Sequence, residues 1–133
     1  MSKGTIIYVG GFELPDKNAA AHRVLTNAKM LRDIGYKVVF LGVNKTNPSK
    51  LLKSKVEDFE TYSIAYPCSL NQWVKYLYSI DAVEDLINQY SDVKAILCYN
   101  YQSVALSKLI KVGKKKNLKI IADCTEWLSL IHI

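Results

Sequence analysis

A strand, a helix and a second strand, separated by glycines, occupy residues 5–43 and constrain the fold more than any other feature. Residues 5–9 are a short run rich in β-branched side chains, as expected of a buried parallel strand. Residues 19–34 place apolar side chains three and four positions apart, which predicts an amphipathic helix with one buried side. Gly35 favours a left-handed stop for that helix, and residues 37–43 predict a second buried strand. Together these segments predict a βαβ unit.

The rest of the chain continues the alternation of strand-like and helix-like segments. The further predicted elements are, in order, a loop at 44–50, a short helix at 51–58, a strand at 59–65, a helix at 70–90 in one piece or two, a strand at 93–99, a helix at 101–112 and a strand at 118–122. Pro67 breaks the chain before the long helical stretch, and Gly113 lies near the expected stop of the last helix. This order predicts a doubly wound, mostly parallel, Rossmann-like α/β sheet with right-handed crossovers.

The composition is that of a single globular domain. A chain of 133 residues suits one domain and is short for two. Hydrophobic residues make up 50% and charged residues 23%, so wholesale disorder is not expected. No apolar run is long enough to cross a bilayer, and the first residues lack the features of a signal peptide. Three cysteines without a CxxC spacing argue against a disulfide scaffold or a zinc site, and fit a reduced cytoplasmic protein.

Basic residues exceed acidic ones by 18 to 12, which gives a net charge of +6. The excess is concentrated in residues 45–55 and 108–119, and it is densest at residues 114–116. The ordinary interpretation is a solvated, lysine-rich surface. The functional interpretation is attraction to phosphate-bearing substrates or to anionic lipid head groups, which would hold the protein peripherally at a membrane. Nucleic acid is not expected as a partner, because such modules usually interleave arginine and aromatic residues on one face.

A pair of glycines follows the first predicted strand, and ligands of doubly wound sheets bind beyond the carboxyl ends of the strands. Gly10 and Gly11 allow backbone N–H groups to approach an anion, and the helix that follows, with Asn18 as its expected N-cap, adds a partial positive charge. A tight turn without a ligand explains the glycine pair equally well. The fingerprint GxGxxG is absent and no acidic residue ends the second strand, which disfavours an NAD site. The absence of GxxxxGK[ST] excludes nucleotide hydrolysis of the P-loop type.

Charged side chains at two further places are candidate ligand contacts. His22 and Arg23 lie in the first turns of the predicted helix, where they could bind a sugar hydroxyl or a phosphate, although a capping or surface pair is the ordinary interpretation. Asp123 and Glu126 follow the fifth strand and could bind hydroxyls or act as a general base. A capped helix start explains that carboxylate pair equally well. No catalytic nucleophile is assigned, since no histidine pairs obviously with a cysteine, and the sequence offers no metal cluster.

Four stretches of the chain carry a resemblance to a known family. Residues 8–12 (Tyr-Val-Gly-Gly-Phe), 14–24 (Leu-Pro-Asp-Lys-Asn-Ala-Ala-Ala-His-Arg-Val) and 31–36 (Leu-Arg-Asp-Ile-Gly-Tyr) resemble the N-terminal domain of retaining GT-B glycosyltransferases of the group 1 (family 4) type. Residues 123–127 (Asp-Cys-Thr-Glu-Trp) are similar to the loop after the fifth strand in the same proteins. The resemblance covers most of residues 3–127 and is most specific in the first strand and helix.

This resemblance implies the N-terminal half of a GT-B fold, in which two Rossmann-like domains face each other across a cleft. The N-terminal domain would hold a glycan or lipid-linked acceptor, and the C-terminal domain would bind the nucleotide-sugar donor and carry a Glu-rich motif. The resemblance implies no metal and no cofactor besides the donor. The implied site residues are Gly10, Gly11 and Arg23 for the donor phosphates, and Asn18, His22, Asp123 and Glu126 for the acceptor.

The sequence departs from the family in two respects. Many relatives have a histidine after the fifth strand, where this chain has Asp123 and Glu126, so neither residue is assigned a catalytic role. The family also needs a second domain, and residues 1–127 supply only the first. One reverse translation of residues 128–133, CTG TCT CTT ATA CAC ATC, resembles a transposon adapter used in sequencing libraries. We therefore expect a truncated chain with a non-native read-through tail, the alternative being a genuine short C-terminal segment.

The expected function is that of the acceptor-side half of a sugar transferase, inactive by itself. The intact parent would transfer a sugar from a nucleotide donor to a glycan or lipid-linked acceptor, as in polysaccharide biosynthesis. It would act in the cytoplasm, with peripheral contact to the inner face of the membrane. The alternative is a non-catalytic, single-domain α/β binding or regulatory module. A receiver domain is disfavoured, because glycines rather than a cluster of acidic residues follow the first strand.

Overall fold

The first βαβ unit lies where the sequence predicts it. In the computed structural model, β1 (Thr5–Gly10) is followed by α1 (Ala19–Ile34) and β2 (Lys37–Asn44). Gly35 follows α1 with a φ of 120°, and the backbone N–H of the next residue donates to the carbonyl of Leu31 at 3.1 Å. This bonding is that of a Schellman motif, which needs a residue with positive φ and therefore favours glycine. The predicted helix stop is confirmed.

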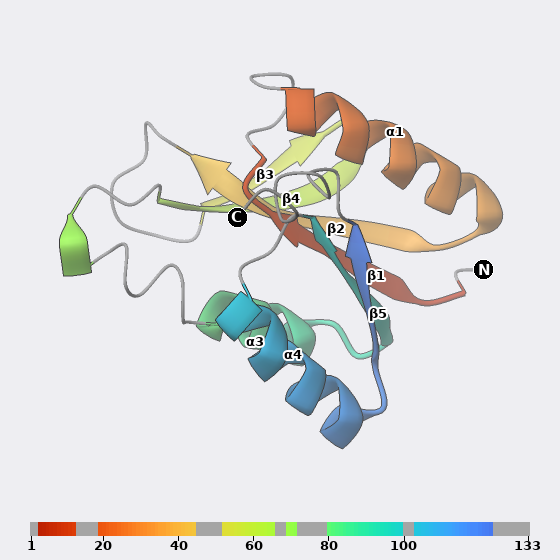
Figure 1. Ribbon diagram of the computed structural model, residues 1–133. Helices are drawn as coiled ribbons and strands as arrows, with labels where there is room; N and C mark the ends of the chain where they lie inside the picture. The colour runs from red at the N-terminus through yellow and green to blue at the C-terminus, as the bar shows by residue number, and fades with distance from the viewer. Residues whose placement is uncertain are drawn as a thin grey trace, which may run out of the picture.

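Six strands form one sheet in the order β3-β4-β2-β1-β5-β6 within the part of the chain that the structure describes (Figure 1). The described residues are 3–12, 19–44, 52–65, 69–71, 80–99 and 103–123. The remaining elements are β3 (Leu52–Val56), β4 (Phe59–Ala65), α3 (Asp81–Gln89), β5 (Val93–Tyr99), α4 (Ser103–Lys116) and β6 (Lys119–Asp123). Every neighbouring pair is parallel except β3 with β4. The chain order reverses between β1 and β5, so the fold is a doubly wound, Rossmann-like α/β sheet, as predicted.

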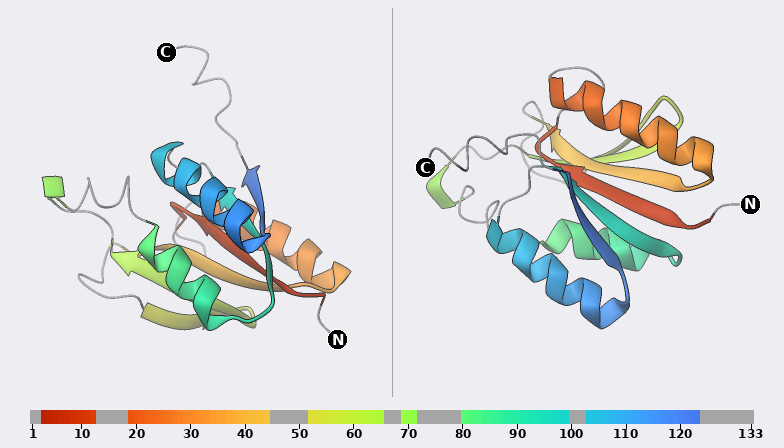
Figure 2. Two further views of the ribbon diagram at one scale, coloured as in Figure 1. Left: turned by 90° about the horizontal axis from the view of Figure 1, so that it is seen from below. Right: turned by 45° about the vertical axis from the view of Figure 1, so that its right-hand side comes forward.

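Helices cover both faces of this sheet: α1 lies on one face, and α3 and α4 lie on the other (Figures 1 and 2). Side chains of β1 alternate between the two layers, because successive residues of a strand point to opposite faces. Ile7 and Val9 belong to the core beneath α3 and α4, whereas Tyr8 belongs to the core beneath α1. The α1 side is rich in aromatic rings, and these are Tyr8, Phe12, Phe40 and Phe59.

The short helix predicted at residues 51–58 is wrong, because this segment forms the edge strand β3 and a tight turn. Glu57 and Asp58 have positive φ values of 48° and 68°, and Val56 pairs directly with Phe59 across the hairpin. Two consecutive residues with positive φ form the kind of turn that matches the twist of a two-strand hairpin. The signal in the sequence is the alternation within 52–56, where apolar or small residues alternate with two lysines.

The last helix is longer than predicted, because α4 continues through Gly113 to Lys116. Its stop is Asn117, whose φ is 59°, and the N–H of Leu118 donates to the carbonyl of Gly113 at 2.8 Å. Gly113 therefore lies inside the final turn of a Schellman motif rather than beyond it. A Cβ at this position would come within 2.8 Å of the Ile120 side chain, so close packing explains the glycine.

Within the predicted helical stretch 70–90, the structure describes α3 as a separate helix that begins after the buried residue Ile80. Residues 72–79 lie outside the described residues, as do Pro67 and the expected N-cap Asn18. The predicted strands at 59–65 and 93–99 are confirmed as β4 and β5, and the strand predicted at 118–122 is β6, shifted by one residue. Residues 124–133, with the expected tail, also lie outside the described part.

Candidate functional site

The carboxyl edge of the sheet brings the ends of β1, β5 and β6 together. Gly10 pairs with Tyr99, and Tyr99 pairs with Asp123, so these three terminal residues are neighbours across the sheet. Ligands of doubly wound sheets bind beyond this edge, at the point where the strand order reverses. The reversal lies between β1 and β5, next to Gly10. This edge is therefore the candidate functional site.

Close packing surrounds Gly10 at the end of β1. A Cβ added there would lie 2.7 Å from the carbonyl oxygen and 2.8 Å from the Cβ of Tyr99, and 3.3 Å from the ring of Phe12. The residue is buried, whereas Gly11 is exposed. The close approach of β5 therefore explains why this position is a glycine, whether or not a ligand binds beside it. Gly11 is the member of the pair that remains accessible to solvent.

Phe12 follows the glycine pair and lies beside the end of β2. Its carbonyl accepts a hydrogen bond from the N–H of Val43 at 3.0 Å, and its ring is fully buried. The ring packs edge-to-face against Tyr8, Phe40 and Tyr99, with ring centroids 5.7 to 6.5 Å apart. This contact anchors the start of the loop between β1 and α1. Residues 13–18, which complete that loop, lie outside the described residues.

Asp123 is the centre of a polar network that joins β1, α1 and β6. The Tyr8 hydroxyl donates to Oδ2 of Asp123 at 2.6 Å, and Nη2 of Arg23 donates to Oδ1 at 2.7 Å. Nδ2 of Asn27 donates to the Tyr8 oxygen at 3.0 Å and lies 3.5 Å from Oδ2. The side chain of Asp123 is only 11% exposed, whereas that of Arg23 is 47% exposed. The two oxygens of the carboxylate thus have different partners: the buried Tyr8 and the half-buried Asn27 contact Oδ2, and the exposed Arg23 contacts Oδ1.

The protonation states within this network follow from burial and charge. Burial is the strongest influence on Tyr8 and, with the adjacent Asp123 carboxylate, raises the pKa of its phenol well above the ordinary value. Burial alone would raise the pKa of Asp123, but the hydrogen bonds from Arg23 and Tyr8 outweigh it and lower that pKa. The hydrogen bond to Asp123 is also the main reason why the pKa of Arg23 is raised. At neutral pH Tyr8 is therefore a fixed hydrogen-bond donor to an ionised carboxylate.

The residues predicted from the sequence are only partly assembled here. Gly10, Gly11 and Asp123 lie at the same edge, and Arg23 contacts Asp123 rather than standing apart from it. His22 is exposed on α1, and its backbone carbonyl accepts a hydrogen bond from the hydroxyl of the residue four positions later. Asn18 and Glu126 lie outside the described residues.

The sequence reasoning missed Tyr8 and Asn27. Tyr8 looks like a core residue of a buried strand, and only the tertiary structure shows a partner for its hydroxyl. Asn27 lies four residues after Arg23, so both belong to one face of α1. That spacing was the available signal, because two polar side chains on one face of a helix can bind the same polar group.

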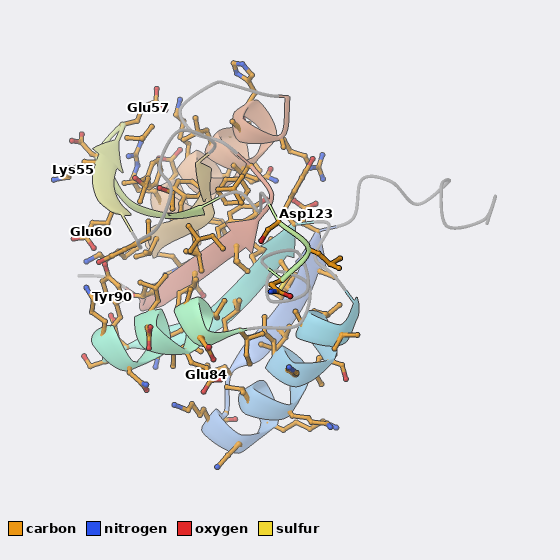
Figure 3. All side chains as sticks on the ribbon, turned by 90° about the vertical axis from the view of Figure 1, so that its left-hand side faces the viewer. Lys55, Glu57, Glu60, Glu84, Tyr90 and Asp123 are labelled. Atoms are coloured by element: carbon orange, nitrogen blue, oxygen red, sulfur yellow. The ribbon has the colours of Figure 1, made fainter. Side chains whose placement is uncertain are left out.

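A second polar cluster lies near the opposite, amino edge of the sheet. The Tyr90 hydroxyl donates to Glu60, Nε2 of Gln89 donates to the Tyr62 hydroxyl at 2.7 Å, and Nζ of Lys37 lies 3.5 Å from Glu60. Figure 3 shows Glu60 and Tyr90 together, far from Asp123. Burial and then the hydrogen bonds to Glu60 and Tyr62 raise the pKa of Tyr90. This cluster links the end of α3 to β2 and β4, and its partners are mutually satisfied.

The described residues lack two kinds of feature, a cluster of metal ligands and a membrane-spanning helix. No group of three or more histidine, cysteine, aspartate or glutamate side chains there could hold a metal ion. None of the helices in that part of the chain combines the length and the apolar character needed to cross a bilayer.

The fold and the site define a doubly wound α/β protein with a Rossmann-like sheet and a polar network at its carboxyl edge. No protein-family model and no curated protein matches the chain. A solved structure described as "Trehalose-6-phosphate from E. coli bound with UDP-2-fluoro glucose" is similar to it, with a TM-score of 0.52 and 16% sequence identity. The match covers 89% of this chain and 32% of that chain, so the 133 residues span about a third of that protein's length. At this identity the likeness concerns the fold.

Proposed function

We propose that the chain is the acceptor-side, N-terminal domain of a retaining GT-B glycosyltransferase of the group 1 (family 4) type. The observation that carries this proposal is the structural match, which extends over 89% of the chain and involves a protein bound to a UDP-sugar analogue. The residues that resemble the family lie in the first βα unit, next to the point where the strand order reverses. The intact parent would transfer a hexose-like unit from a nucleotide sugar to a glycan or lipid-linked acceptor.

The proposed roles of the edge residues follow from their charge and position. Gly10 and Gly11 would lie against the donor phosphates, with the accessible Gly11 making the closer approach. Asp123 is ionised, because hydrogen bonds keep its pKa low, and it could accept hydrogen bonds from acceptor hydroxyls. Asn18, His22 and Glu126 would complete the acceptor side, and all three remain proposals.

Arg23 would bind a donor phosphate only if its contact with Asp123 were shared or broken. Its guanidinium already contacts Asp123, so a donor phosphate must share this cation or displace the carboxylate from it. Asp123 would keep its hydrogen bond from Tyr8 if Arg23 turned away, and 47% of the Arg23 side chain is exposed to an incoming anion. Arginine has five N–H donors in a planar group, which suits it to bridging a carboxylate and a phosphate.

In the proposed reaction the bond between the sugar C1 and the donor phosphate breaks, and a bond forms from C1 to the acceptor oxygen. The nucleoside diphosphate would leave with the bonding electrons, and the proton of the acceptor hydroxyl would pass to the leaving diphosphate oxygen and from there to solvent. We assign no catalytic residue in this chain, because the sugar and the diphosphate would be held chiefly by the second domain. No metal or cofactor is proposed beyond the nucleotide-sugar donor.

The source gene and the enzyme that it encodes test this proposal. The genomic sequence beyond the codon for Trp127 should encode a second α/β domain with a Glu-rich motif. In the full-length enzyme, Asp123→Asn should raise the KM for the acceptor about 10- to 100-fold, the loss expected for a hydrogen bond to a charged group. Arg23→Gln should act mainly on the KM for the donor. Asp33→Asn, at an exposed position of α1, is the matched control and should leave both constants unchanged.

The second candidate is a non-catalytic α/β binding or regulatory module. The observation in its favour is that these residues have structural roles without any ligand. Asp123 is paired with Arg23, and Gly10 is needed for packing against Tyr99. A natural stop codon directly after Trp127 would favour this module and would overturn the transferase proposal.

The proposed location is the cytoplasm, with peripheral contact to the inner face of the membrane. This location follows from the proposed lipid-linked acceptor and from the excess of lysine over acidic residues.

A further inference from the structure

The strand β6 forms one edge of the sheet and lacks the charges that protect the other edge. In the strand order β3-β4-β2-β1-β5-β6, no strand of the described residues pairs with the outer side of β6. The opposite edge strand, β3, carries two lysines among its five residues. Charged side chains on an edge strand oppose its pairing with another chain. β6 instead has three apolar residues in a row between its terminal Lys119 and Asp123.

Exposed apolar side chains lie along β6 on both faces of the sheet. Figure 2 shows β6 between α1 on one face and α4 on the other. Ile121 shares the α1 face with Asp123, because alternate residues of a strand point to the same side, and it is 46% exposed. Ala122 points to the α4 face and is also exposed. On that face Ile110 is 42% exposed, and it lies on α4 three positions before Gly113, which packs against β6.

The sequence of β6, Lys-Ile-Ile-Ala-Asp, is complementary to itself in the antiparallel direction. A two-fold axis at Ile121 would place this residue opposite its copy, and Lys119 opposite Asp123 of the second copy. Residues 119 and 123 point to the same face of the sheet, so a pair of opposite charges would form on each side of the axis. An axis one residue earlier or later would place both charged residues opposite uncharged ones.

Both charges are available for such a contact. Lys119 is exposed, and no ion pair involves it within the part of the chain that the structure describes. Asp123 is ionised at neutral pH, because the hydrogen bonds from Arg23 and Tyr8 keep its pKa low. Each oxygen of a carboxylate has two lone pairs, so Asp123 can accept a further hydrogen bond from an ammonium group without losing Arg23.

We propose that the chain forms a two-fold symmetric dimer, in which the β6 strands of two copies pair in the antiparallel direction and join the two sheets into one. The backbone groups on the outer side of β6 bond to those of the second copy, and Ile121 is buried against its equivalent. An apolar edge strand without protecting charges is a template for this kind of pairing. The proposal goes beyond sugar transfer and does not depend on it.

Sedimentation velocity of the 133-residue chain at a series of concentrations measures the dissociation constant of the dimer. The mass should rise from that of one chain toward that of two as the concentration increases. The variant I121K places two ammonium groups opposite each other and removes the burial of two isoleucine side chains, so it should raise the dissociation constant about 10- to 100-fold. V104K is the matched control, because Val104 is 42% exposed but lies on α4, outside the paired strand, and this variant should leave the constant unchanged.

Reversal of one charge tests the register of the pairing. K119E should raise the dissociation constant about 10-fold, since two attractive pairs with Asp123 become repulsive. K3E makes the same change of net charge at an exposed residue before β1 and should have no effect. Hydrogen–deuterium exchange gives a second measure, because the amides of residues 119–123 should become more protected as the concentration rises. Circular dichroism of each variant verifies that it is folded.

Three outcomes would overturn the proposal. The first is the mass of a single chain at every concentration that can be reached, and the second is an equal effect of I121K and V104K, which would place the contact away from β6. The third is protection of residues 119–123 that does not change with concentration, which would show that another segment of the same chain covers β6. None of these outcomes bears on the transferase proposal, whose test lies in the source gene and the intact enzyme.

Discussion

At the scale of single residues, the main finding is that one buried hydroxyl positions the carboxylate at the sheet edge. Tyr8 is fully buried, yet its hydroxyl lies 2.6 Å from Asp123, which is 115 positions away in the sequence. A buried phenol needs a hydrogen-bond partner, and an ionised carboxylate is the strongest acceptor that a side chain provides. The pair therefore links β1, the first strand along the chain, to β6, the last strand in the described residues.

Replacing Tyr8 with phenylalanine should lower the free energy of unfolding by about 1 to 3 kcal/mol. The ring and its packing against Phe40 remain, while Asp123 and Asn27 both lose a hydrogen-bond partner. Urea denaturation followed by circular dichroism measures the change. Tyr36→Phe is the matched control, since the Tyr36 hydroxyl has no hydrogen bond within the described residues, and its effect should stay within about 0.5 kcal/mol. Equal losses in both variants would contradict the proposed role of Tyr8.

The carboxylate of Asp123 should also make stability depend on pH. Its pKa is lower in the folded chain than in the unfolded chain, where an aspartate has a pKa of about 3.9. The ionised form therefore stabilises the fold above that pH, and this contribution is lost as the pH falls through the folded pKa. Arg23 stays protonated throughout.

We therefore expect Asp123→Asn to be less stable than the parent sequence at neutral pH, with a difference that shrinks as the pH falls below about 4. Urea unfolding of both chains at a series of pH values measures this difference. Asp33→Asn provides the comparison, since Asp33 is exposed on α1. A difference between the parent and Asp123→Asn that stays constant across the whole pH range would refute the assignment.

At the scale of secondary-structure elements, local patterns placed most boundaries correctly and failed where the backbone leaves its common conformations. The hairpin of β3 and β4 depends on positive φ values at Glu57 and Asp58, which non-glycine residues rarely adopt. Salt bridges and stacking fix this turn against α1: Lys29 pairs with Glu57 at 3.0 Å, and the Arg32 guanidinium lies 4.4 Å from the ring centre of Phe59. A prediction from the sequence of residues 51–58 alone cannot include these contacts with α1.

Replacing Asp58 with glycine should raise the free energy of unfolding by about 1 kcal/mol, because glycine adopts positive φ without the steric cost of a Cβ. The turn retains Glu57 and its contact with Lys29. The same substitution at Asp33, in the last turn of α1, should instead lower the free energy of unfolding by about 0.3 kcal/mol, the difference in helix propensity between aspartate and glycine. Thermal or urea unfolding distinguishes the two signs, and a loss of stability in Asp58→Gly would argue against a strained turn.

At the scale of the whole molecule, the polar network of the described residues lies at one end of the sheet. The carboxyl edge collects Tyr8 from β1, Arg23 from α1 and Asp123 from β6. A parallel sheet gathers its strand ends in this way, because each crossover helix runs back from the carboxyl edge to the amino edge (Figure 1). The proposed ligand contacts therefore lie at one edge of the domain.

On the proposed function, the purified 133-residue chain should show no glycosyl transfer, because the active site of a GT-B enzyme would lie between this domain and a second one. The measurement is release of the nucleoside diphosphate from a panel of nucleotide sugars, with the full-length enzyme as the positive control. Sustained turnover by the 133-residue chain would contradict this prediction. It would show that the carboxyl edge described above suffices for catalysis.

Local sequence determined the elements from β1 to β2 and the presence of β4, β5 and β6, because the spacing of apolar residues and the stop at Gly35 act over a few positions. The same patterns indicated the sheet class, since strands that alternate with helices have few ways to pack. Only the tertiary structure decided the hairpin turn at Glu57 and Asp58 and the packing role of Gly10. It also decided that Tyr8, Arg23 and Asp123 form one network. Those contacts join residues far apart in the chain, and their geometry exists only when the sheet edge is assembled.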